Sequence, residues 1–265
     1  MFLGIDVSTH NGAIDWDKVK ASGIEFAMIR AGYGQNHIDS KFVYNISECN
    51  RVGIPCGVYW FSYALNAAAA KREAQYCLQA VKPYKLEYPV AFDFEYDSVS
   101  YAQKNGITIT KALASEIAEA FCSEIEAANY YALNYSNLDY LSRYYTAEIA
   151  NKFGLWLAAW NTKAEPPRSC QIWQYSSTGK VNGMSGNVDM NRCYVDFPKV
   201  IAKAGKNNLQ QKSETDKAQD WAIENGLIKG YANGGGYGWN DALTRGQLIT
   251  ILYRFFNKYK SGELK

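Results

Sequence analysis

Two acidic residues, Asp93 and Glu95, lie near the end of an apolar stretch that spans residues 88–96. Side chains of a β-strand alternate between its faces, so this pattern predicts a buried strand with both carboxylates on one face. Unpaired charge is costly in a core, which makes such a pair a candidate for chemistry. Paired carboxyl groups cleave glycosidic bonds: one protonates the leaving oxygen and the other supports attack on the sugar. The alternative is a strand that leaves the core, with both acids solvated or holding an arginine.

The composition is that of a globular protein with many aromatic residues. Hydrophobic residues make up 48% of the sequence and charged residues 20%. The length of 265 residues leaves room for one barrel-sized domain and a small second one. The net charge of +2 argues against a dedicated nucleic-acid binder but is compatible with anionic polymers. Aromatic residues make up 15%, including 21 Tyr and 7 Trp, and their rings can stack on sugars, although most aromatic side chains serve in cores.

Cysteines and histidines limit the chemistry further. The six cysteines are scattered without Cys-x-x-Cys spacing, so we expect mostly reduced thiols in a protein made in the cytosol. The two histidines, His10 and His37, nearly exclude a multi-histidine metal site and Ser-His or Cys-His catalytic pairs. The first residues enter a strand pattern without the features of a targeting segment, and no stretch is apolar enough to span a membrane.

Short apolar runs alternate with helical patterns, which predicts an α/β protein. Strand candidates lie at residues 2–7, 26–34, 53–63, 88–96, 130–136, 153–160, 171–176 and 186–191. Helical patterns lie at residues 15–19, 41–52, 66–81 and 110–128. Because helical patterns become rare after the fifth run, we expect hairpin links among the later strands. The set predicts an irregular TIM-like β/α barrel, with its site at the carboxyl rim of the strands.

Five separated motifs occur in an order that resembles one known family. They are Gly4-Ile5-Asp6-Val7-Ser8, Phe92-Asp93-Phe94-Glu95, the segments 155–160 and 172–176, and Val188-Asp189-Met190-Asn191. Through this set, residues 1–197 resemble glycoside hydrolase family 25, and the combination is much more specific than any single motif. Members of that family are lysozymes, also called muramidases, and many are phage endolysins. The resemblance implies a catalytic barrel that acts on peptidoglycan glycan strands and needs no metal or other cofactor.

The resemblance implies roles for four acids. It makes Glu95 the general acid that protonates the oxygen between N-acetylmuramic acid and N-acetylglucosamine, with Asp93 as its partner. Asp6 and Asp189 match two further family acids, which a closed barrel brings side by side. Cleavage with retention is implied, in which the second carboxylate is a nucleophile or orients the acetamido group of the substrate. Four crowded acids should raise at least one pKa, as an acid catalyst near neutral pH requires.

Other residues near these motifs have expected positions. Without the resemblance, Asp189 is equally well explained as a turn residue. Asp97 continues the acidic alternation and would suit a metal, but we expect it in the loop beyond the strand. Arg30 lies inside an apolar run, so we expect it to face the acid cluster as a counter-ion, or to restrain Asp93 or Asp6. Aromatic residues at strand ends are candidate walls of the glycan site: Tyr33, Tyr59, Tyr63, Tyr135, Trp156 and Trp160.

The end of the chain has a different character. Residues 198–212 contain no acid, and we interpret them as a partly helical linker. Residues 213–265 hold two helical patterns around a Gly-rich turn at 234–236 and resemble one S-layer homology motif, with Trp221 and Arg245 at positions tied to ligand binding or packing. Such motifs anchor proteins to anionic cell-wall polymers, usually three together, so we expect this small domain to form a homo-oligomer or to pack on the barrel. The alternative is a docking helix pair without a ligand.

The sequence leaves two functions open. The first is a modular endolysin that hydrolyses peptidoglycan while its tail holds it to the wall. The second is a non-catalytic protein that binds wall glycan. The four acids favour the first, because a binding relic would have no reason to keep a costly acid cluster. Since no signal peptide is recognisable, we expect synthesis in the cytoplasm of the bacterial host and action on the wall after release, without membrane insertion and with no nucleic acid as partner.

Overall fold

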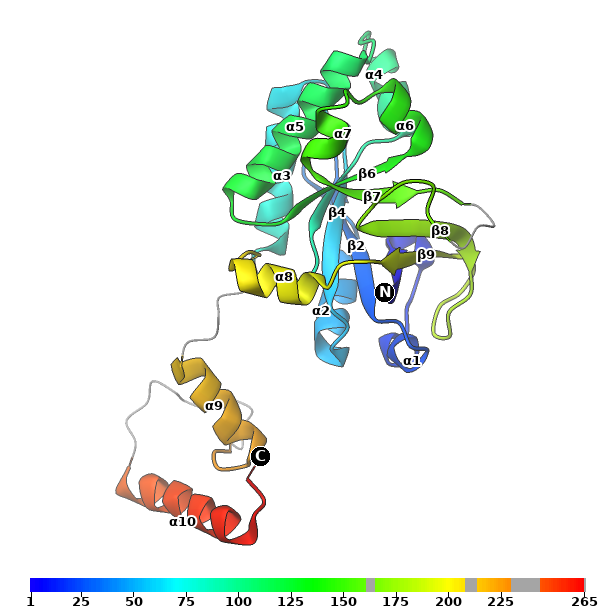
Figure 1. Ribbon diagram of the computed structural model, residues 1–265. Coiled ribbons are helices and arrows are strands. Elements are labelled where there is room, and N and C mark those ends of the chain that lie inside the picture. Colours follow the sequence, from blue (N-terminus) through cyan, green and yellow to red (C-terminus); the bar gives the residue numbers. More distant parts are fainter. Residues whose placement is uncertain (161–164, 208–213, 230–243, 265) are drawn as a thin grey trace. The chain divides into compact units, whose positions relative to one another are not determined.

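The computed structural model describes residues 1–160, 165–207, 214–229 and 244–264. The chain forms two compact units, Met1–Leu209 and Gln210–Lys265 (Figure 1). Within the described ranges, no helix has both the length and the apolar character needed to cross a membrane. All six cysteines are free thiols, and only Cys170 among them is not buried.

The first unit is a closed β-barrel surrounded by helices (Figure 1). Its strands are β1 (Phe2–Val7), β2 (Phe26–Tyr33), β3 (His37–Ile38), β4 (Cys56–Phe61), β5 (Val90–Asp93), β6 (Ala132–Asn137), β7 (Gly154–Ala158), β8 (Ile172–Gly179) and β9 (Val188–Cys193). The order is β1-β9-β8-β7-β6-β5-β4-β2, and pairing of β1 with β2 closes the ring, while β3 forms a short edge on β2. β9 is antiparallel to both neighbours, whereas the other barrel strands pair in parallel. The predicted irregular TIM-like barrel, with a hairpin near its end, is therefore confirmed.

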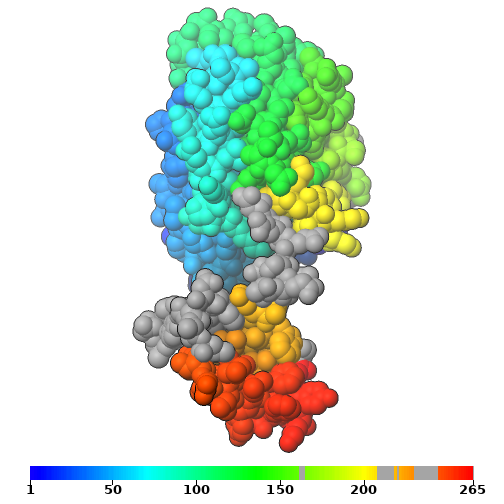
Figure 2. Space-filling view, turned by 90° about the vertical axis from the view of Figure 1, so that its left-hand side faces the viewer, coloured from blue at the N-terminus to red at the C-terminus, as the bar shows by residue number. Residues whose placement is uncertain are grey.

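Helices link the parallel strands and cover the outer face of the barrel. They are α1 (Trp16–Ala21), α2 (Phe42–Val52), α3 (Ala67–Val81), α4 (Tyr96–Lys104), α5 (Lys111–Ala127), α6 (Leu138–Arg143), α7 (Ile149–Lys152) and α8 (Phe197–Ala204), with a short 3-10 helix, η1 (Thr9–Asn11). Figure 2 views the side on which α3 and α5 lie over the strands. Three predicted helices begin after a residue whose side chain accepts a hydrogen bond from a first-turn N–H: Asp15, Asn66 and Thr110. The sequence analysis does not predict α4, α6 and α7.

Side chains fill the barrel from inside and pack against helices outside. On the outer face, the ring centroid of Phe92 lies 5.1 Å from that of Phe121 on α5. On the inner face, Ala91, Leu133 and Trp156 belong to a separate buried cluster. Because this interior is filled, a ligand site can form only at an end of the barrel.

Helix α8 belongs to the first unit, although residues 198–204 fall in the predicted linker. The ring centroid of Phe197 lies 5.4 Å from that of Tyr88 and 5.3 Å from that of Tyr131. Tyr88 precedes β5 and Tyr131 precedes β6, so α8 packs at the amino-terminal end of these strands. Residues 198–204 of the predicted, partly helical linker therefore form most of a helix that buries its apolar face against the barrel.

The strand predicted over residues 88–96 is shorter than expected. β5 ends at Asp93, and Glu95 is the N-cap of α4, so the two acids do not share a strand face. Asp97 lies in the first turn of α4 rather than in a loop. The Ser98 hydroxyl accepts a hydrogen bond from the Glu95 N–H at 3.0 Å, and acidic side chains are favourable near a helix N-terminus. These local interactions begin the helix where the alternating pattern predicts more strand.

The second unit contains two helices, α9 (Glu214–Glu224) and α10 (Arg245–Ser261). The ring centroids of Trp221 on α9 and Phe255 on α10 lie 6.3 Å apart, so the helices share an aromatic contact. Arg245 is exposed at the start of α10. The predicted Gly-rich turn at 234–236 lies outside the described residues.

Candidate active site

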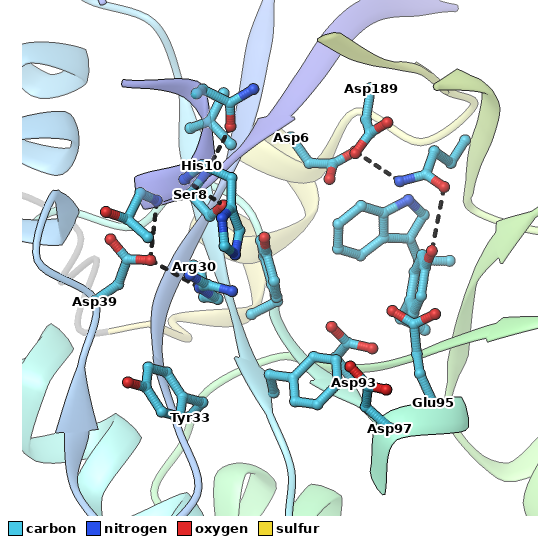
Figure 3. Close-up of a pocket in the computed structure, with 18 of the residues that line it drawn as sticks. Asp6, Ser8, His10, Arg30, Tyr33, Asp39, Asp93, Glu95, Asp97 and Asp189 are labelled. Carbon is cyan, nitrogen blue, oxygen red and sulfur yellow. Dashed lines mark hydrogen bonds and ion pairs between the residues drawn. The ribbon is translucent and has the colours of Figure 1, made fainter. Parts of the chain in front are cut away.

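A cavity of about 790 Å³ opens at the carboxyl end of the barrel strands (Figure 3). This volume is typical of small-molecule sites, which range over roughly 300–1,000 Å³. Six carboxylate residues line it: Asp6, Asp39, Asp93, Glu95, Asp97 and Asp189. Only Arg30 and His10 are basic among the described lining residues. We call this space the acidic cavity, and it brings together all four acids that the sequence analysis singles out.

Asp6 and Asp189 form a pair across two strands. They lie directly opposite each other where β1 and β9 run antiparallel, and Figure 3 shows their side chains close together. Burial, followed by the charge of Asp189, raises the pKa of Asp6 to about 7, although hydrogen bonds from two amides oppose the shift. Burial also raises the pKa of Asp189. Such a pair can retain a proton near neutral pH.

Asp93 and Glu95 form a second pair, at the junction of β5 and α4. Asp93 is buried, and its Oδ1 has no hydrogen-bond partner within the part of the chain that the structure describes. Burial, followed by the charges of Glu95 and Asp6, raises the pKa of Asp93 well above its usual value. Glu95 is half-buried, and burial raises its pKa too, with further contributions from the charges of Asp97 and Asp189. The hydrogen bond between the two carboxyls lowers the pKa of Glu95 and raises that of Asp93.

Two amides that the sequence analysis does not single out hold Asp6. The Nε2 of Gln174 donates to Asp6 Oδ2 at 2.9 Å, and the Nδ2 of Asn191 donates to the same oxygen at 2.7 Å. The amide oxygens accept hydrogen bonds from aromatic residues, Gln174 from Tyr135 and Trp160 and Asn191 from Trp156. Both amides occur inside the motifs 172–176 and 188–191, and a buried amide on an apolar strand is the signal that could have identified them.

Arg30 does not form an ion pair with the acid cluster. Its Nε donates to Asp39 Oδ2 at 2.7 Å, and the side chain of Asp39 is fully buried. The Asp39 carboxylate also accepts hydrogen bonds from the backbone N–H groups of Thr9 and Lys41, at 3.0 and 2.8 Å. A desolvated carboxylate requires such partners, which explains why Arg30 forms its ion pair with Asp39. Arg30 thus lines the acidic cavity, as expected, but its ion pair is with Asp39 and not with Asp93 or Asp6.

Of the six aromatic residues predicted as walls of the glycan site, five line the acidic cavity and one does not. Those that line the acidic cavity are Tyr33, Tyr59, Tyr63, Tyr135 and Trp156. Trp156 is buried, and its ring packs edge-on against Tyr59 and Tyr135, so it supports the wall from behind. Trp160, beyond β7, does not line the cavity and is 63% exposed. Tyr33 and Tyr63 leave part of their rings accessible at the rim, where a sugar could stack.

Comparison with known sequences identifies one family. The model described as "Glycosyl hydrolases family 25" matches residues 5–184. Lysozyme M1 of Streptomyces globisporus is 29% identical over 210 residues, which cover 76% of this chain and 70% of that protein. The autolytic lysozyme of Clostridium acetobutylicum is 25% identical over 195 residues, which cover 71% of this chain and 54% of that protein.

Comparison with solved structures gives the same fold. The modular autolysin LytC from Streptococcus pneumoniae superposes with a TM-score of 0.63 at 30% identity, over 72% of this chain. The match covers 46% of LytC, so this chain spans about half the length of that protein. The CTP1L endolysin superposes with a TM-score of 0.62 over 97% of this chain and 100% of that one, at 18% identity, which indicates likeness of fold alone.

Proposed function

Because this chain belongs to glycosyl hydrolase family 25, we propose that its acidic cavity hydrolyses the β-1,4 bond between N-acetylmuramic acid and N-acetylglucosamine in bacterial peptidoglycan. The proposal rests chiefly on Glu95, a half-buried carboxyl with a raised pKa, which stands beside buried Asp93 in an open cavity. Relatives support the substrate: two are lysozymes by name, and LytC has been solved with a synthetic peptidoglycan ligand.

In the proposed reaction, Glu95 donates its proton to the glycosidic oxygen as the bond to the anomeric carbon breaks. Asp93 is either the nucleophile or the group that orients the substrate acetamido oxygen for attack. In both roles the ionised carboxylate is the active form, since it supplies the electron pair for attack or accepts the acetamido N–H. When ionised, the Asp6–Asp189 pair stabilises positive charge at the anomeric carbon.

The first test of this proposal is the incubation of purified Gram-positive peptidoglycan with the protein. We expect new reducing ends of N-acetylmuramic acid, detected by a reducing-sugar assay and mass spectrometry. Glu95→Gln should bind the wall but lower kcat by about 10²–10⁴-fold, since the amide cannot supply the proton. Glu116→Gln is the matched control, because Glu116 is exposed on α5 and does not line the acidic cavity. Wall binding without new reducing ends would favour the non-catalytic alternative.

We further propose that the second unit holds the protein on the wall, through an anionic polymer and by self-association. Its resemblance to an S-layer homology motif, with Trp221 and Arg245 as candidate contacts, supports the first part. Support for self-association comes from exposed apolar residues at helical spacing on α10: Ile249, Leu252, Tyr253, Phe256 and Tyr259. The protein would then act on the cell wall after release from the cytoplasm that makes it.

A further inference from the structure

A second cavity, of about 600 Å³, adjoins the acidic cavity. The two share Tyr33, Tyr63 and Asp97, and Tyr33 and Asp97 lie in the lower part of Figure 3. The second cavity is formed by the β2–β3 turn, the segment after β4, and helices α3 and α4. A ligand in the acidic cavity can therefore extend into it. The proposed cleavage step uses none of its remaining residues.

The charge of this second cavity is opposite to that of the first. Arg72 on α3 and Lys104 on α4 are exposed in its lining, and neither has a hydrogen bond or ion pair to another described residue. Asp97 is the one carboxylate among the described residues that line it. In the acidic cavity, by contrast, Arg30 is paired with Asp39. Two unpaired cations in a concave wall attract an anion, so we call this space the cationic pocket.

A row of three tyrosines runs from the shared lining into the second cavity: Tyr33 and Tyr63 line both cavities, and Tyr101 lines the second. The ring centroid of Tyr63 lies 6.4 Å from that of Tyr33 and 5.1 Å from that of Tyr101, edge-on in both cases. The backbone N–H of Tyr63 donates to Oε1 of buried Glu73 at 3.1 Å, which fixes the middle of the row. A neutral sugar needs rings but no cations. A ligand that combines a sugar with an attached carboxylate could use both kinds of side chain, because the rings would stack on the sugar and the cations would bind the carboxylate.

We propose that the cationic pocket binds a carboxylate carried by N-acetylmuramic acid, namely one on its peptide stem. This inference rests on the proposed function, because it takes the peptidoglycan strand as substrate. Each stem hangs from the lactyl group of the sugar and bears free carboxylates. Removal of the stem leaves the lactyl carboxylate, a second source of the same chemistry. Arg72 and Lys104 thus give the enzyme a preference for strands that retain their stems.

The test compares the Arg72→Ala/Lys104→Ala double variant with the unmodified protein on three soluble substrates. These are uncrosslinked strands with stems, strands stripped by an amidase, and stripped strands with amidated lactyl groups. On strands with stems, we expect KM to rise about tenfold with kcat unchanged, and the rise to shrink at high salt. On the other two substrates, KM should change less than twofold. Lys71→Ala is the control, since Lys71 is exposed on α3 but lines neither cavity.

The other outcomes either change the ligand that is assigned to the cationic pocket or overturn the inference. A higher KM on both carboxylate-bearing substrates, but not on amidated strands, would keep the pocket and show that it accepts the free lactyl carboxylate as well as one on the stem. An unchanged KM on all three, or an equal rise on amidated strands, would overturn the inference. Calorimetric binding of a stem-bearing muropeptide to the Glu95→Gln chain, with and without the double substitution, makes the same comparison without turnover. A chain that cleaves nothing would therefore refute the proposed function and still test the pocket.

Discussion

At the scale of single residues, the four acids differ in what surrounds them. Asp6 accepts hydrogen bonds from two amides, which stabilise its ionised form. Asp93 Oδ1 has no partner among the described residues, and the charge of Arg30 offsets the burial of this carboxyl only in part. Glu95 lies between these cases, because it is half-buried and two neighbouring carboxylates raise its pKa. One fold thus gives similar groups different proton affinities, as acid catalysis requires.

The charge of Asp97 should control the upper pH limit of activity. It is one cause of the raised pKa of Glu95, so Asp97→Asn should lower that pKa. Activity needs protonated Glu95, and the alkaline limb of the pH profile of kcat should therefore move to lower pH. A series of kcat values on soluble glycan strands measures this limb.

Asp139→Asn is the matched control, because Asp139 is a carboxylate on nearby α6 and does not contribute to the shift at Glu95. An alkaline limb that stays in place in Asp97→Asn, or moves as far in the control, would contradict the electrostatic account.

At the scale of elements, α3 supports the segment that follows β4. Glu73 of α3 is buried, and its Oε1 accepts the N–H of Tyr63, which borders both cavities. Its Oε2 has no partner in the described part of the chain. Burial raises the pKa of Glu73 to about 7. Because the pKa of Glu73 is higher in the folded protein than in the unfolded chain, protonated Glu73 contributes to stability. This contribution is complete below pH 4.5, the pKa in the unfolded chain, and is lost as the pH rises through about 7.

Substitutions at Glu73 should separate its support of Tyr63 from its charge. Glu73→Gln keeps an acceptor for the Tyr63 N–H, so KM should not change, and unfolding at pH 8 should need more denaturant than in the unmodified protein. Glu73→Ala leaves that N–H unpaired beside a cavity, which should cost about 2–3 kcal/mol and raise KM several-fold. Urea titrations at pH 4 and pH 8, with KM on soluble glycan, measure both effects. Equal KM values for the two variants would mean that Glu73 does not position Tyr63.

At the scale of the whole molecule, the two units predict separable activities. A chain that ends at residue 209 contains the whole barrel, α8 and all the residues of both cavities. It should keep kcat on soluble strands within about twofold but bind whole cell walls at least about tenfold more weakly, if the second unit supplies the anchor. Wall sedimentation and analytical ultracentrifugation of both chains measure binding and self-association. If the shorter chain binds cell walls as tightly as the full chain, the second unit is not the anchor.

Much of this protein is determined by local sequence. Short apolar runs indicated the strands, because the inner and outer faces of the barrel wall are both apolar. Two predicted helical ranges start at Asn66 and Thr110, and the side chains of these residues cap the helices in the structure by satisfying backbone groups close in the chain. The acids could be recognised because charge at the end of an apolar run is costly unless it has a use.

The contacts among the acids and their partners depend on closure of the barrel. Asp6 meets Asp189 and accepts hydrogen bonds from Gln174 and Asn191 only because β1 pairs with β9, far away in the sequence. Arg30 pairs with Asp39 rather than with Asp93 or Asp6, because the desolvated carboxylate of Asp39 needs a partner. Such choices depend on which groups the closed sheet brings together and strips of water. Neither the spacing of residues nor their local preferences contains that information.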